Sequence, residues 1–288
     1  ILAAAALRAG TLEVTQQVWG FDGHAVPGRI NLLSVELSNL TPLPFDGMLA
    51  LSKQGGLGTS LDAPLVEPCF LSPGARRWVQ FTPYLRGERE AWTLEWGRGA
   101  DGSAKLKEPA FGPPARVMLH DPDGLPALGR TTAFPLLPDN LFPPTVAATD
   151  GLHSVLLDHV PRWEPVRRQA FLDWLRRGGE VHVLLGRTGR HPVFADELAV
   201  LNSAIARTHV GAGLVVRHAL SRREVTADGL AAAGCPPPKL KVTNDYDANR
   251  ISNLEEALFG ALGDLTRPHH NWGLIYLTII AYGVVIGP

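Results

Sequence analysis

The feature that most constrains this chain is a strand, a helix and a second strand in close succession within residues 151–189. Residues 154–158 and 180–185 are short, mainly apolar runs, and such runs suit parallel strands that are covered on both faces. Between them, residues 165–177 carry apolar side chains at steps of three and four, which predicts an amphipathic helix. Because two buried strands joined by such a helix form a right-handed crossover unit, an α/β domain is expected.

The predicted helix has clear start and stop signals. Pro165 suits the first helical position, where its missing N–H has no intrahelical partner to lose. Gly178 and Gly179 follow the helix, and glycine adopts the left-handed cap conformation without steric cost. The expected apolar stripe consists of Val166, Ala170, Phe171, Trp174 and Leu175.

This unit resembles the class I glutamine-amidotransferase-like domain. The resemblance lies in the strand that ends at Asp158, the helix that closes at Gly178-Gly179, and the strand over residues 181–185. Active members of that family place a cysteine in a tight Gly-x-Cys-x-Gly elbow directly after the second strand. This chain has Gly186-Arg187-Thr188-Gly189 there, with neither cysteine nor serine. The resemblance therefore implies the fold, and the missing nucleophile implies a degenerate, non-catalytic member.

Residues 10–113 read as a β-sandwich. Short runs alternate between apolar and polar residues and are separated by glycine and proline, which is typical of strands buried on one face. Residues 33–39, the turn at Pro73-Gly74 and residues 78–82 resemble immunoglobulin-like modules of bacterial envelope proteins. The expected strands include residues 12–15, 33–38, 48–51, 78–82 and 92–96.

The two ends of the chain differ from the middle. Residues 1–9 look like a signal-peptide remnant. Residues 272–288 carry no charge, and at about 1.5 Å per residue they would reach roughly 26 Å, close to the hydrocarbon thickness of a bilayer. Residues 269–288 are therefore predicted as an incomplete transmembrane helix; a buried core helix is the alternative. The membrane-anchor residues would be Trp272, Tyr276 and Tyr282.

The expected fold class is thus multidomain β plus α/β. The predicted parts are a signal remnant (1–9), an immunoglobulin-like sandwich (10–113), an open parallel-sheet α/β domain of amidotransferase or flavodoxin type (114–268) and the membrane helix (269–288). This order resembles bacterial envelope proteins in which a sandwich and an amidotransferase-like domain precede membrane helices. The resemblance implies a protein of the bacterial inner membrane, with one or several spans and its bulk in the periplasm.

Charge and cysteine content exclude other classes of function. The formal net charge is −1, from 27 basic and 28 acidic residues, which argues against nucleic acid as a partner. Cys69 and Cys235 are expected to be buried thiols, although a bridge between domains is the alternative in an oxidising compartment. Neither has metal-ligand spacing to a histidine, so the sequence predicts no metal site and no cofactor.

Open α/β sheets bind ligands at the carboxyl ends of their strands. Two predicted strands end there in a histidine beside an aspartate, a pair that can orient a base or bind a metal, or can simply be a polar strand end. Thr188, the one hydroxyl in the elbow, would need His159 or His191 as a base. The candidate ligand-crevice residues are His120, Asp121, Asp158, His159, Arg187 and Thr188.

The leading hypothesis is a pseudoenzyme: a non-catalytic, membrane-anchored extracytoplasmic scaffold that takes part in protein–protein interaction. Its partners would be the lipid bilayer and other envelope proteins in a larger assembly. The alternative is a ligand-sensing or hydrolase/amidotransferase-like α/β domain that uses the crevice. Glycan binding by the sandwich tryptophans Trp19, Trp78, Trp92 and Trp96 is a third hypothesis, against the default of core packing.

Overall fold

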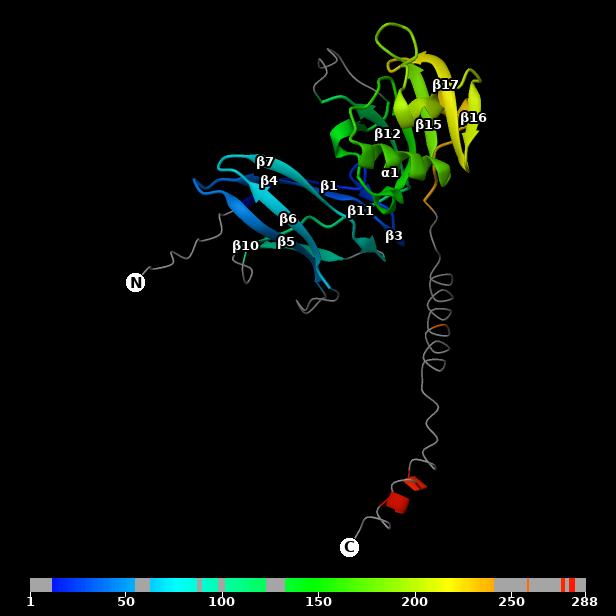
Figure 1. Ribbon diagram of the computed structural model, residues 1–288. Coiled ribbons are helices and arrows are strands. Elements are labelled where there is room, and N and C mark those ends of the chain that lie inside the picture. The colour runs from blue at the N-terminus through cyan, green and yellow to red at the C-terminus, as the bar shows by residue number, and fades with distance from the viewer. Residues whose placement is uncertain are drawn as a thin grey trace. The chain divides into compact units, whose positions relative to one another are not determined.

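Figure 1 presents a computed structural model of the chain, which describes residues 12–54, 63–86, 90–97, 102–122 and 133–240, with helical residues 258, 276–277 and 280–282. The chain divides into two compact units, 1–240 and 241–288. Strands dominate the first unit, and they form several sheets, one of which is mixed and mainly parallel. The coarse expectation of a β plus α/β chain is therefore confirmed.

Two antiparallel sheets share one hydrophobic core in the N-terminal region. The three-stranded sheet has the order β1-β4-β7, and the four-stranded sheet has the order β10-β9-β5-β6. Leu33, Val35 and Leu37 alternate with polar neighbours along β4 and are fully buried against the other sheet. The strands are β1 (Leu12–Trp19), β4 (Leu33–Asn39), β5 (Phe45–Gln54), β6 (Leu65–Leu71), β7 (Arg76–Phe81), β9 (Ala91–Trp96) and β10 (Gly102–Lys105).

The sandwich is tied to the α/β part by buried side chains and by hydrogen bonds. Phe21 and Leu32 belong to the hydrophobic core of the α/β sheet. Gln80 donates from Nε2 to the carbonyl oxygen of Leu141 at 2.7 Å. Two short pairs lie nearby in sequence: β2 (His24–Ala25) with β11 (Ala110–Phe111), and β3 (Arg29–Ile30) with β8 (Tyr84–Leu85).

The α/β part is built on a six-stranded sheet with the order β13-β12-β14-β15-β17-β16. The expectation of an all-parallel sheet is corrected, because β16 pairs antiparallel to β17 through a two-residue turn in which Gly211 has a φ of 63°. The strands are β12 (Ala115–His120), β13 (Leu136–Pro138), β14 (Leu152–Leu157), β15 (Glu180–Leu185), β16 (Arg207–Val210) and β17 (Gly213–Ser221).

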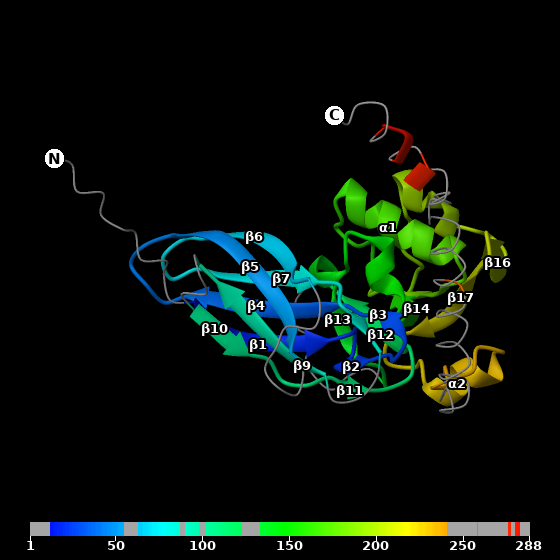
Figure 2. The same cartoon turned by 90° about the horizontal axis from the view of Figure 1, so that it is seen from below.

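The sheet is covered on both faces (Figure 2). Helix α1 (Pro165–Arg176) packs on one face, where alternate residues such as Val181 and Val183 of β15 are buried. Helix α2 (Ala227–Ala232) covers the opposite face together with Val225 and Cys235. Three 3-10 helices complete the connections: η1 (Asp139–Leu141), η2 (Val146–Thr149) and η3 (Asp196–Leu201).

Helix α1 begins at Pro165 and ends before Gly178, which has a φ of 116°, as its start and stop signals predict. Its buried stripe differs by one residue from the expected one. Leu172 is buried, whereas Val166 is 61% exposed. Val166 lies in the first turn, ahead of the part of the helix that contacts the sheet.

The predicted membrane helix is wrong. Among the residues that the structure describes, no helix is long and apolar enough to cross a bilayer. Within 269–288 the described helical residues are 276–277 and 280–282, where Tyr276 and Tyr282 are exposed; Trp272 lies outside the described residues, as does the signal remnant at 1–9. Absence of charge suggested the span, but spanning also requires about 20 helical residues in succession. The inner-membrane location, which rested on this helix, is corrected with it.

Two residues on the same helix test the assignment of its buried face. Phe171→Ala removes a fully buried ring that contacts Phe142, Trp163 and Trp174, so we expect a loss of about 3–5 kcal/mol in the free energy of unfolding. Val166→Ala is the matched control and should change that energy by less than about 0.5 kcal/mol. Urea denaturation measures both. Equal losses in the two variants would contradict the orientation of α1.

Candidate functional site

The carboxyl ends of several strands meet at one edge of the sheet, and polar side chains gather there. Strands β12, β14 and β15 are neighbours and run parallel, so the adjacency required for the predicted crevice is present. Strand β13 also runs parallel to β12, and β17 to β15. Residues that follow any of these strands therefore share this edge.

Asp158, which follows β14, is held by two partners. Arg222, which follows β17, lies with its Nε 2.8 Å from Oδ2 and donates from Nη2 to Oδ1 at 2.8 Å. His159 lies with its Nδ1 2.9 Å from the same Oδ1. Burial alone would raise the pKa of Asp158, but His159 and Arg222 outweigh burial and hold that pKa below its usual range. Arg222 also donates to the carbonyl oxygen of Leu119, so it joins the ends of β12, β14 and β17.

A second carboxylate completes this network. Asp139 follows β13, is 4% exposed, and lies with Oδ2 3.7 Å from Nε2 of His159. Burial alone would lower the pKa of His159, but the carboxylates of Asp139 and Asp158 outweigh burial and raise that pKa to about 9. At neutral pH the imidazole is therefore a cation held between two carboxylates. We call Asp139, Asp158, His159 and Arg222 the strand-end network.

Two of the six predicted crevice residues, Asp158 and His159, are in direct contact. Asp158 and His159 are in the strand-end network, where their partners are Asp139 and Arg222, which sequence reasoning did not select. His120 and Asp121 are half-buried at the end of β12. Arg187 and Thr188 are exposed on the turn after β15, whose Gly186 lies close to the backbone of Asp158.

The surroundings of Thr188 do not activate it as a nucleophile. Activation needs an adjacent neutral base. Of the two histidines considered, His159 is bound to Asp158, and His191 directs its Nε2 to the carbonyl oxygen of His218 at 3.0 Å. The exposed hydroxyl also lacks the dry surroundings in which electrostatic stabilisation is strongest.

A second group of polar side chains lies on the face of the sheet that α2 covers. His182 of β15 is fully buried, and its Nδ1 is 3.1 Å from Nε2 of His218 on β17. Its Nε2 is 3.7 Å from Oε2 of Glu180, and Nε2 of His153 is 3.5 Å from that same oxygen. Burial lowers the pKa of both His182 and His153, and burial with the neighbouring His182 lowers the pKa of His218 to about 4. These imidazoles are therefore neutral at physiological pH.

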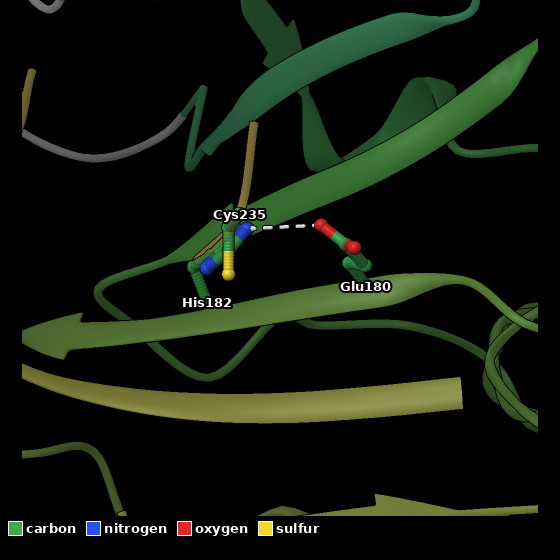
Figure 3. Close-up of side chains that lie close together, drawn as sticks. All are labelled: Glu180, His182 and Cys235. Carbon is green, nitrogen blue, oxygen red and sulfur yellow. Dashed lines mark ion pairs between the residues drawn. The ribbon is translucent and has the colours of Figure 1, made fainter. Parts of the chain in front are cut away.

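Cys235 reaches this second group from the segment after α2 (Figure 3). The ligand atoms of Glu180, His182 and Cys235 all lie within 4.8 Å of one another. Both cysteines are buried free thiols, as one of the two sequence alternatives predicts. Sequence spacing could not find this group, because Cys235 is far along the chain from the two β15 residues.

Two hollows in the described residues lie away from the strand-end network. One, of about 620 Å³, runs between β1 and β10, and the other, of about 390 Å³, is lined by residues that include His191, Asn202 and Arg217. Trp19, Trp92 and Trp96 are each 5% exposed or less, so these three rings pack in the core and offer no sugar platform.

Comparisons with known proteins do not identify a family. No family model and no curated protein matches the chain. Among solved structures, the chain is similar to an alkylpurine DNA glycosylase from Pseudomonas fluorescens, with 16% identity over 34% of this chain and 30% of that one and a TM-score of 0.24. It is also similar to a cycloisomaltooligosaccharide glucanotransferase from Paenibacillus sp., with 12% identity over 61% of this chain and 28% of that one and a TM-score of 0.29. A β-glucosidase from Chaetomella raphigera is similar with 13% identity over 34% of this chain and 18% of that one and a TM-score of 0.23. The chain spans under a third of each, and such low TM-scores carry no argument.

The strand-end network predicts a specific dependence of stability on pH. His159 has a folded pKa of about 9 against about 6.5 in an unfolded chain, so the stability it supplies is complete below about pH 6.5 and is lost as pH rises through about 9. We expect the difference in unfolding free energy between the native chain and His159→Gln to shrink by on the order of 2 kcal/mol across this window. Denaturation in buffers between pH 6.5 and 9.5 measures it.

Asp139→Asn provides the companion variant for this experiment. It removes one of the two carboxylates that raise the pKa of His159, so the decline in stability should move to lower pH. A difference that stays constant across the whole window would show that His159 is not held as a cation.

Proposed function

We propose that this chain is a non-catalytic interaction protein, a subunit of a larger assembly, which docks a partner protein on the outward face of β5 and β6. The observation that carries the proposal is an apolar patch on this face. Met48, Val66 and Phe70 are 50%, 47% and 53% exposed. Exposed apolar side chains that adjoin one another mark interaction surfaces more often than scattered ones do.

The register of the two strands makes the patch continuous. Met48 lies opposite Pro68, and Ala50 lies opposite Val66. Directly opposite residues in an antiparallel pair share a face and lie within side-chain contact of each other. The intervening residues Leu49 and Cys69 point into the sandwich core, so the patch is the solvent side of a regular strand pair.

The surroundings of the patch indicate the charge of the partner and its mode of docking. The exposed carboxylate of Asp46 lies beside it, because Asp46 pairs with Phe70 across the strands. A partner with an apolar centre and basic residues at its rim would complement this surface. Pro68 lies in β6, the outer strand of its sheet, and proline cannot donate a ladder hydrogen bond. This favours docking on the face over addition of a strand at the edge.

The strand-end network supports the non-catalytic part of the proposal. Both oxygens of Asp158 are engaged by Arg222, and His159 is a cation at neutral pH, so neither is free to act as a base. The turn after β15 presents an exposed Thr188 in place of a cysteine or serine. These groups stabilise the sheet edge through their mutual contacts.

The strand order supports a finer proposal about the fold. Counting the seven long strands of the sandwich in chain order, one sheet holds the first, second and fifth, and the other holds the seventh, sixth, third and fourth. This arrangement is consistent with an immunoglobulin-like sandwich. For the α/β part, we propose a degenerate amidotransferase-like domain, because the 186–189 turn directly follows a central parallel strand that neighbours β14.

A paired substitution tests the docking surface. Met48→Ser combined with Phe70→Ser removes the centre of the patch, and we expect binding of the natural partner to weaken by about 10- to 100-fold. Val193→Ser is the matched control, since Val193 is 82% exposed but lies in the α/β part. Co-purification of the full chain from its host, followed by titration of the partner so recovered, gives the measurement.

The same experiment can overturn the proposal. Partners retained equally by the patch variant and the control would remove the patch from the interaction. Sedimentation showing that the purified chain dimerises through the patch would make a second copy the occupant. Turnover of glutamine or another amide that is lost in Asp158→Ala would show that the α/β part is an enzyme.

A further inference from the structure

Three side chains with different metal-binding chemistry converge beneath α2. Glu180 and His182 lie two residues apart on β15 and so point to the same face of the sheet. Cys235, in the segment that follows α2, lies close to both of them (Figure 3). A carboxylate, an imidazole and a thiol, each able to supply one ligand atom, thus meet at one point, with all three atoms within 4.8 Å of one another.

The distance between His182 and Glu180 is too long for a hydrogen bond and matches that between two ligands of one ion. Nε2 of His182 is 3.7 Å from Oε2 of Glu180, whereas an N–H···O hydrogen bond spans about 2.7–3.2 Å. In a tetrahedral zinc site with bonds of about 2.0–2.3 Å, neighbouring ligand atoms lie roughly 3.3–3.8 Å apart. Within the described part of the chain, neither of these two atoms makes a hydrogen bond, although His182 is fully buried. Buried polar atoms without partners carry a cost that a bound cation would remove.

We propose that this chain binds one Zn²⁺ through Glu180, His182 and Cys235, with a fourth position left to water or to a further ligand. The ligand set of carboxylate, imidazole and thiolate suits zinc, which accepts oxygen, nitrogen and sulfur together. His218 supports the imidazole: its Nε2 lies 3.1 Å from Nδ1 of His182, so a proton on Nδ1 leaves the lone pair of Nε2 directed at the ion.

Two guanidinium groups of the described residues border the site. Arg207 donates from Nη2 to Sγ of Cys235 at 3.8 Å, and it is also held by the carbonyl oxygens of Ala233 and Gly234. Arg116 lies 3.7 Å from Glu180, but its Nε donates to Ser154 at 2.7 Å and its Nη2 donates to the carbonyl oxygen of Pro236 at 2.9 Å. These bonds hold the guanidinium without Glu180, which leaves the carboxylate for the metal. Burial raises the pKa of Cys235, so the thiol is protonated in the metal-free chain. When zinc forms its bond to Sγ, that proton passes to solvent.

Zinc titration of the full chain tests the proposal. The chain is stripped with a chelator and titrated with ZnCl₂, and bound metal is measured by elemental analysis alongside the proton release in weak buffer. We expect one zinc per chain, with affinity reduced about 100-fold or more in Cys235→Ser and in Glu180→Gln. Cys69→Ser is the matched control, because Cys69 is the other buried cysteine and lies in the sandwich core. It should bind zinc as the native chain does.

Cobalt substitution provides a second readout, which is taken first on the native chain. Co²⁺ bound to the native chain should give a near-ultraviolet thiolate-to-metal charge-transfer band, and the band should persist in Cys69→Ser. Failure of the native chain to bind stoichiometric zinc would overturn the proposal. So would a cobalt spectrum without the thiolate band, or equal zinc affinity in Cys235→Ser and Cys69→Ser.

Discussion

The six-stranded sheet is covered on both faces, so any polar side chain on its central strands or at their crowded ends must find a partner within the protein. This requirement accounts for most of what is unusual in the α/β part. Asp158 meets it with Arg222 and His159, and those two reach across to Leu119 and Asp139. Arg116 meets it in part, by donating to Ser154 and to the carbonyl oxygens of Cys235 and Pro236. These hydrogen bonds and ion pairs connect loops that are far apart in sequence at one edge and on one face of the sheet.

The strand-end network and the group under α2 differ in how far their polar atoms are paired within the protein. In the strand-end network, two carboxylates and two cations are matched, and both oxygens of Asp158 are taken. Under α2, His182 and Glu180 face each other at 3.7 Å with a thiol nearby, and the contacts stay incomplete. The carboxylate of Asp158 is therefore closed to a substrate, although Nε2 of His159, 3.7 Å from Asp139, makes no hydrogen bond to any described residue. The incomplete contacts under α2 are the ones that the proposed zinc ion would complete. In the sandwich, the unmatched groups are apolar: on β5 and β6, Phe70 and its neighbours expose apolar surface to water.

Sequence periodicity predicted the elements whose burial is regular. Both central strands, the cap of α1 at Gly178 and the alternation in β4 follow from local pattern alone. Local pattern failed where the outcome depends on residues far apart. Strand β16 pairs with the edge of β17, Asp139 reaches His159 from η1, and Arg222 reaches Asp158 from the end of β17. An uncharged run at the C-terminal end suggested a membrane span, but composition does not fix helix length, and the described residues contain no such helix.

The central claim is that the strand-end network is occupied by its own contacts and so cannot supply a general base. The most direct measurement is ¹⁵N NMR of the histidine side chains at pH 7.5, with His159 assigned from His159→Gln. The raised pKa of about 9 predicts that both ring nitrogens of His159 are protonated. A neutral ring with one unprotonated nitrogen at that pH would contradict the account, because such a ring could accept a proton from a nucleophile.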